Sequence, residues 1–285
     1  MGLFGKLFDK KECSICGGEI GLLGNRKLED GNLCKECAKK LSPWFDDRRH
    51  STVDQIAEQL EYREANKEKV ASFRTTRILG ESTKVMLDED AGVFMVTSSR
   101  NYAEENPDVV AFSDVTGCDL DIDEDRTEIT RTNAEGEEIS YNPPRYVYEY
   151  DFYMNIHVRN PYFDTMRFKL NNSSVRIEDN GGMNRHMGMN RNMGMGMSKG
   201  GFQINFGGMG NMNSQMGPEN DIDFRQYKEM GEEIKAALMQ VRQQAREEMA
   251  AAAAPKAAVT CPFCGATTTP DANGCCEFCG GAVGR

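Results

Sequence analysis

Eight of the ten cysteines form four Cys-x-x-Cys pairs, two toward each end of the chain. The two sets of four are Cys13, Cys16, Cys34 and Cys37, and Cys261, Cys264, Cys276 and Cys279. A Cys-x-x-Cys turn directs two sulfurs at one ion, and two such turns complete the four-sulfur tetrahedron that Zn²⁺ prefers. The spacing therefore predicts two structural Zn²⁺ ions, one in each set. Four thiolates leave no coordination position open, so neither site is expected to be catalytic.

The C-terminal set repeats one short motif, because both of its halves read Cys-x-Phe-Cys-Gly. Cys275 offers an alternative ligand beside Cys276, with a wider spacing to Cys279, but only Cys276 preserves the repeat. Cys275 and Cys118 are therefore interpreted as thiols outside the metal sites, and Cys118 as a small buried residue of a strand. A segment as short as 255–285 cannot bury a sufficient core, so the metal must hold its fold.

The composition narrows the class of function. The 285 residues carry a net charge of −11, with 45 acidic and 34 basic side chains. A protein that binds chiefly a phosphate backbone needs clustered Lys and Arg, so nucleic acid is disfavoured as the main partner. The chain has only three histidines, and we find no nucleophile motif or phosphate-binding loop. We therefore expect no enzymatic activity.

The ends of the chain bear on its location. The start has no apolar run of signal-peptide length, and no run of eighteen apolar residues occurs anywhere, so we expect a cytoplasmic protein whose thiols bind metal. Residues 1–11 alternate apolar residues with lysines. They could make weak peripheral contact with the inner face of an anionic membrane, or pack on the first zinc module. Vesicle flotation with and without residues 1–10 would separate the two.

The remaining patterns predict an α+β chain of several modules. We expect an N-terminal zinc module (1–48), a helical connector (49–79), an antiparallel β domain (80–180), a disordered Met/Gly/Asn-rich loop (181–218), an amphipathic helix (219–254) and a zinc ribbon (255–285). In the connector, apolar spacing predicts a helix over about 52–76, capped by Ser51 or Thr52. The long helix could pack on the β domain or form a homodimeric coiled coil, and the oligomeric state stays open.

The β domain is predicted from short alternating segments separated by turns. The expected strands are Thr83–Leu87, Val93–Thr97, Val109–Phe112, Thr116–Ile122, Thr127–Thr132, Tyr146–Val158, Thr165–Leu170 and Ser174–Ile177. The turn residues Asn142-Pro-Pro144 are expected to break the chain. One antiparallel sheet folded as a sandwich or open barrel would accommodate these strands.

Two further patterns have competing interpretations. Asp119, Asp121, Asp123 and Asp125 alternate, but neither frame of an EF-hand has its Gly and Glu, so a solvated strand edge is favoured. Residues 81–150 hold 18 acidic and 5 basic residues, which places most of the excess charge on the β domain. The methionines of 183–216 could bind Cu(I), adapt to apolar partners or form a plain spacer.

Three stretches resemble known families. The segment ECSICGGEIGLLGNRKLEDGNLCKECAKKLSPWF resembles bacterial domain of unknown function 4428, through Cys13, Cys16, Cys34, Cys37 and the intervening glycines. The segment CPFCGATTTPDANGCCEFCGGAVGR is similar to bacterial zinc-ribbon tails. The middle, with FSDVTGCDLDID and MRFKL, is similar to bacterial pleckstrin-homology-like domains, although the Met-rich insertion departs from them. These resemblances imply bacterial origin and zinc-ribbon-like folds, and they supply no activity.

The sequence thus favours a non-enzymatic zinc-binding protein that acts as an adaptor or scaffold for protein partners. A nucleic-acid-binding ribbon is one alternative, since Phe263 and Phe278 could stack on bases, but residues 256–285 carry no net charge. A metal- or redox-responsive regulator that uses its Cys-x-x-Cys pairs is another.

Overall fold

The computed structural model describes residues 11–179, 217–253, 258–271 and 274–283. The chain divides into two compact units, Met1–Met239 and Gln240–Arg285. The predicted Met-rich loop lies outside the described residues as far as Met216, and the methionines of the copper hypothesis lie there too. The amphipathic start lies outside them as far as Lys10. No helix of the described part has both the length and the apolar character of a membrane span.

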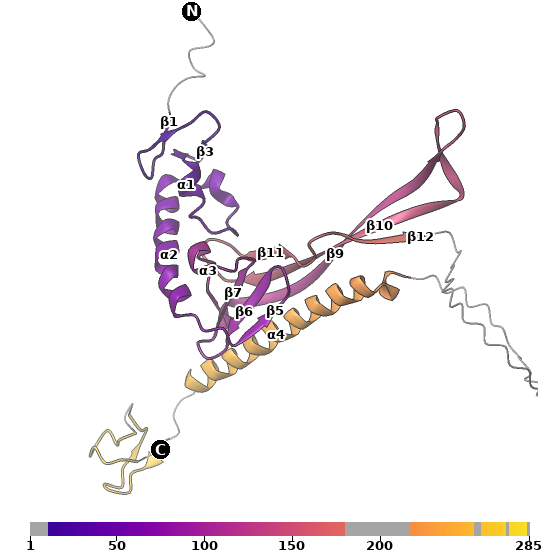
Figure 1. The fold of residues 1–285 in the computed structure, drawn as a ribbon. Coiled ribbons are helices and arrows are strands. Elements are labelled where there is room, and N and C mark those ends of the chain that lie inside the picture. Colours follow the sequence, from indigo (N-terminus) through magenta and orange to yellow (C-terminus); the bar gives the residue numbers. More distant parts are fainter. Residues whose placement is uncertain (1–10, 180–216, 254–257, 272–273, 284–285) are drawn as a thin grey trace, which may run out of the picture. The chain divides into compact units, whose positions relative to one another are not determined.

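Two small hairpins and two short helices form the N-terminal module (Figure 1). They are β1 (Lys11–Glu12) with β2 (Glu19–Ile20), β3 (Arg26–Lys27) with β4 (Asn32–Leu33), α1 (Lys35–Ala38) and η2 (Asp47–His50). Its small core contains Leu28 and Leu33, both fully buried, and Ile56 contributed by the next helix. The module therefore depends on a neighbouring helix for part of its core.

That helix, α2 (Val53–Ser72), falls within the predicted range. Thr52 caps it: the Thr52 hydroxyl accepts from the Gln55 N–H, and the Gln55 side chain accepts from the Thr52 N–H at 2.9 Å. Ile56 lies in the core of the N-terminal module, whereas Val70 packs with Met86 of the β domain. α2 thus joins the two cores.

The antiparallel strands of the β domain, β5 to β12, form two sheets, not the single folded sheet that we expected. The first has the order β5 (Arg77–Leu79), β6 (Lys84–Asp88), β7 (Val93–Thr97), β8 (Val110–Ala111). The helix α3 (Tyr102–Glu105) lies between β7 and β8 in sequence, and η3 (Phe112–Asp114) follows β8. Gly92, at φ +69°, ends the turn between β6 and β7, in a backbone conformation that favours glycine. None of the described strands closes a barrel.

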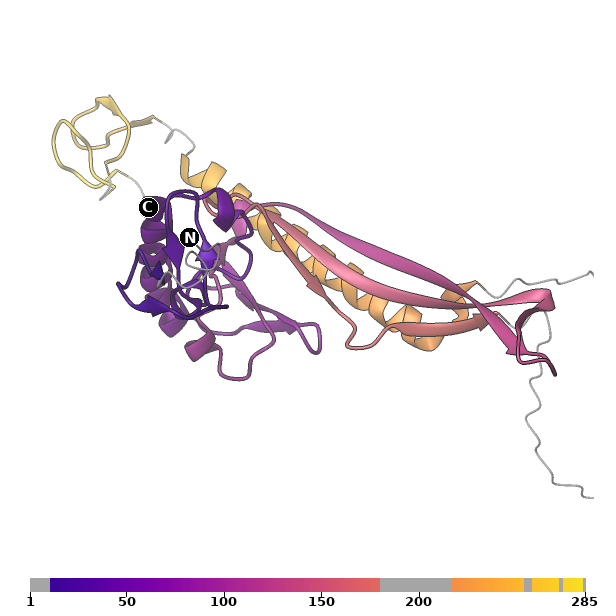
Figure 2. The ribbon, with the colours of Figure 1, turned by 90° about the horizontal axis from the view of Figure 1, so that it is seen from above.

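The second sheet is built on two long strands, β9 (Val115–Thr132) and β10 (Glu138–Val158), which Figure 2 shows side by side. Two predictions are corrected here: 116–122 and 127–132 form one strand, and Asn142-Pro-Pro144 lies within β10. The prolines are accommodated because the register shifts between Ser140 and Arg145, where the ladder is irregular. The other edge of β10 pairs with β11 (Thr165–Lys169) and then with β12 (Val175–Asp179).

Asn171 fills the break between β11 and β12. It is 2% exposed, its Oδ1 accepts from the Phe152 N–H at 2.9 Å, and its Nδ2 donates to the Tyr150 carbonyl at 3.2 Å. Its side chain thus satisfies the part of the β10 backbone that neither short strand reaches. Asn171→Ala should lower the free energy of unfolding by about 1–3 kcal/mol, because buried polar groups lose their partner. Urea denaturation measures this; the exposed neighbour Asn172→Ala is the control, and equal losses would contradict the role.

The long helix α4 (Ile222–Ala253) follows the turn η4 (Pro218–Asn220), and its first part packs on the second sheet. The ring of Phe224 lies 5.0 Å from that of Tyr150 and 5.1 Å from that of Phe152, between ring centres. Ile234 and Leu238 are fully buried farther along the helix. The apolar face formed by Phe224, Ile234 and Leu238 is therefore buried, in agreement with the alternative in which this helix packs on the β domain.

Candidate metal centres

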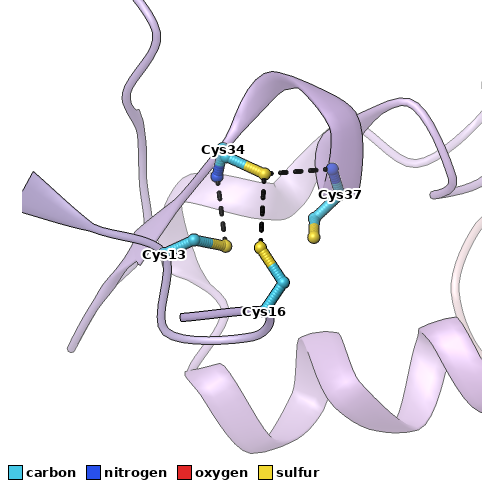
Figure 3. Close-up of side chains that lie close together, drawn as sticks. All are labelled: Cys13, Cys16, Cys34 and Cys37. Atoms are coloured by element: carbon cyan, nitrogen blue, oxygen red, sulfur yellow. Dashed lines mark hydrogen bonds between the residues drawn. The ribbon is translucent and has the colours of Figure 1, made fainter. Parts of the chain in front are cut away.

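The structure brings the four N-terminal cysteines together, with all four Sγ atoms within 4.8 Å of one another (Figure 3). Cys13 and Cys16 come from the turn after β1, Cys34 is the N-cap of α1, and Cys37 lies in that helix. The Gly17 N–H donates to the Cys13 carbonyl at 2.8 Å, and Gly17 has φ +69°, which a side chain would disfavour. A tight turn thus points both sulfurs inward.

Backbone N–H groups point at the sulfurs of this set. The Cys34 N–H donates to Cys13 Sγ at 3.3 Å, and the Cys37 N–H donates to Cys34 Sγ at 3.3 Å. Burial raises the pKa of Cys13, but the N–H groups of Cys16, Cys34 and Ile15 outweigh it and lower that pKa to about 6. Burial and the neighbouring thiols raise the pKa of Cys37. Without a cation, these shifts favour the thiolate at Cys13 and the thiol at Cys37, whereas a metal ion would stabilise the thiolate at both.

In the C-terminal set, the two Cys-x-Phe-Cys-Gly knuckles have the same backbone geometry. The four Sγ atoms of this set also lie within 4.8 Å of one another, with Cys261 and Cys279 Sγ 3.5 Å apart. In each knuckle the glycine after the second cysteine has positive φ, +72° at Gly265 and +70° at Gly280. Each glycine N–H donates back to the carbonyl of the first cysteine, at 2.9 and 2.8 Å. The sequence repeat therefore corresponds to a structural repeat.

The two remaining cysteines lie apart from these sets. Cys276, not Cys275, contributes its sulfur to the C-terminal set and is 2% exposed. Cys275 forms an isolated β-bridge with Ala282, and its N–H donates to Asp271 Oδ1 at 2.8 Å. Cys118 is 4% exposed, and burial raises its pKa to about 12, so it is a protonated core residue.

The alternating aspartates of β9 lie on a half-exposed face, where they meet basic residues across the sheet. Arg167 of β11 donates to Asp121 Oδ2 at 2.7 Å and lies 3.6 Å from Asp123, and His157 Nε2 lies 3.3 Å from Asp119. The Arg167 hydrogen bond holds the pKa of Asp121 below its usual value. The sequence predicted the solvated edge but gave no sign of these partners, which depend on strand register.

Comparison with known families agrees with the N-terminal resemblance. The family model described as Domain of unknown function (DUF4428) matches residues 11–59, which include the first four cysteines and the start of α2. Neither curated proteins nor solved structures give a match. The chain therefore carries this domain at its N-terminal end and a second four-cysteine set near its C-terminal end, each able to hold a metal ion. The likeness of the middle to pleckstrin-homology-like domains stays a prediction.

Proposed function

We propose that this chain is a non-enzymatic protein with two structural Zn²⁺ ions, which presents its small metal modules to protein partners. The observation that carries the proposal is the closed form of both sets: four sulfurs converge, and thiolates at every position leave none for substrate or water. Thiolate sets of this kind suit Zn²⁺ among the common metals and would persist in a reducing cytoplasm.

Exposed apolar side chains on both modules support the binding role. Phe263 and Phe278 are 71% and 70% exposed, one in each C-terminal knuckle, and Leu22 and Leu23 of the N-terminal module are 78% and 83% exposed. Aromatic side chains are enriched in the buried cores of protein interfaces, which favours the two phenylalanines as anchors. The metal fixes the knuckles, so these side chains are displayed with little conformational entropy left to lose on binding.

The test compares a ribbon-surface variant with a matched control. The full-length Phe263→Ser/Phe278→Ser variant should retain two Zn²⁺ per chain but bind its protein partner at least tenfold more weakly, because buried aromatic anchors each contribute about 1–3 kcal/mol. Ile222→Ser removes an equally exposed apolar side chain from α4. Partners are captured on the wild-type chain, purified and titrated against all three proteins.

Two results would count against the proposal. Equal affinity of all three proteins would remove the knuckle aromatics from the interface. A partner that is lost on nuclease treatment, with the aromatic variant still affected, would favour the nucleic-acid alternative, in which the two rings stack on bases.

A further inference from the structure

The N-terminal module has a basic cavity that the metal-binding role does not use. The cavity measures about 770 Å³ and lies where β3 meets η2. Its basic lining consists of Arg26 and Lys27 from β3 and Arg48, Arg49 and His50 from η2. The arrangement is unexpected in a chain with a net charge of −11, and residues distant in sequence create it.

Within the described part of the chain, the lining of this cavity has more positive than negative charge. Among the described residues, no carboxylate forms an ion pair with Arg26, Arg48 or Arg49, whereas His50 Nδ1 lies 2.6 Å from Asp47 Oδ1. Glu29, the carboxylate of the lining, is exposed and unpaired there. Four cations against one carboxylate leave an excess of positive charge, which is unfavourable, so the cavity would be stabilised by an anion.

The cavity wall is fixed before any ligand arrives. The Arg48 guanidinium donates to the Lys27 carbonyl at 2.6 Å, which ties η2 to β3. Burial, together with the charges of Arg49 and Arg26, lowers the pKa of Arg48, as expected for cations that face one another. Arg49 and Lys27 remain exposed at the cavity and can reach a ligand.

We propose that this cavity binds a small molecule with two or more phosphate groups. Guanidinium groups present planar pairs of N–H donors that match phosphate oxygens, and several such groups together suit a multiply charged anion. The lining contains no aromatic side chain on which a base could stack. The acidic surface of the rest of the chain would repel a long polyanion more than a compact one.

The test titrates inorganic pyrophosphate into the full-length, zinc-loaded chain by calorimetry at 0.15 M salt. We expect saturable binding, at least tenfold weaker in Arg26→Gln/Arg49→Gln. Arg225→Gln/Arg246→Gln removes the same charge from exposed positions of α4 and should bind within twofold of the wild type. All eight metal-ligand cysteines are present in each protein, so extraction of zinc by pyrophosphate would give the same heat in all three.

Several outcomes would overturn the proposal. They are the absence of binding at millimolar pyrophosphate, an equal loss in both double variants, and tighter binding of a single-stranded RNA or an acidic peptide at the same arginines. Melting temperature and zinc content are measured for each variant. If the double variant does not fold, the single variant Arg49→Gln replaces it, because Arg49 is exposed and its loss should not disturb folding. This single variant should bind pyrophosphate at least threefold more weakly than the wild type.

Discussion

With the proposed two Zn²⁺ ions bound, Cys37→Ser should release one of them and unfold the N-terminal module. The free energy of binding at structural zinc sites, about 10–16 kcal/mol, is largely folding free energy, because the ligand set does not exist in the unfolded chain. Cys37 is 5% exposed and belongs to the same small core as Leu33 and Ile56. The damage should therefore spread into the start of α2. Elemental analysis and amide hydrogen exchange measure the two effects.

The C-terminal set supplies the comparison. Cys276→Ser should also reduce the metal content from two ions to one. The rise in amide hydrogen exchange should stay within Gln240–Arg285, because the C-terminal set belongs to this second compact unit. Cys275→Ser is the matched control one position away and should retain both ions. Loss of zinc in Cys275→Ser, or retention of both ions in Cys276→Ser, would show that the ligand choice is wrong.

Features that depend on local chemistry could be predicted from the sequence. The Cys-x-x-Cys turns need only a few neighbouring residues, and the structure gathers the same eight sulfurs. Alternation predicts the strand Val93–Thr97 with its observed bounds, and the cap of α2 is Thr52, one of the two candidates. In each case the backbone bonds and the side-chain pattern lie within one short segment, so no distant contact is required.

Features that depend on distant partners could not be predicted. The segment EYREANKEK interrupts the apolar spacing of α2, yet Arg63 and Asn66 within it are buried, because they bond to Asp108 and Val109, more than 40 residues further along the chain. Gly231 of α4 has the same character: a Cβ there would lie 2.6 Å from Leu120 Cδ1 of β9. The local sequence pattern does not predict such contacts between distant residues. The basic cavity, assembled from β3 and η2, is a further example.

A buried ion pair holds the N-terminal module, α2 and the β domain together. Arg63 Nη1 lies 2.7 Å from Asp108 Oδ1, and their side chains are 6% and 0% exposed. Arg63 Nε also donates to the Lys40 carbonyl at 3.2 Å, and the Ser42 hydroxyl donates to Asp108 Oδ2 at 2.8 Å. Burial raises the pKa of Asp108, and Arg63 and Ser42 oppose that effect. One charge pair therefore connects three segments.

A second, neutral set of hydrogen bonds surrounds this pair. Asn66 Nδ2 donates to the Pro107 carbonyl at 2.7 Å, and its Oδ1 accepts from the Val109 N–H at 3.0 Å. Asn106 has φ +54°, a left-handed conformation that is uncommon outside glycine, and its Nδ2 donates to the Arg63 carbonyl at 2.8 Å. The chain before β8 is thus held to α2 by side chains on both sides of the ion pair.

Arg63→Met should lower the free energy of unfolding of the first unit by about 3–5 kcal/mol, because Asp108 would remain buried without its counter-charge. Lys67→Met, one helical turn later, removes a cation whose ion pair with Glu64 is exposed, and should change stability by less than about 1 kcal/mol. Combining Arg63→Met with Asp108→Leu should recover part of the loss, since no unpaired charge then remains. Urea denaturation of the wild type and the three variants, each prepared with zinc, measures these differences. A loss in Arg63→Met no larger than in Lys67→Met, or no recovery in the double variant, would mean that packing, not charge, holds the three segments together.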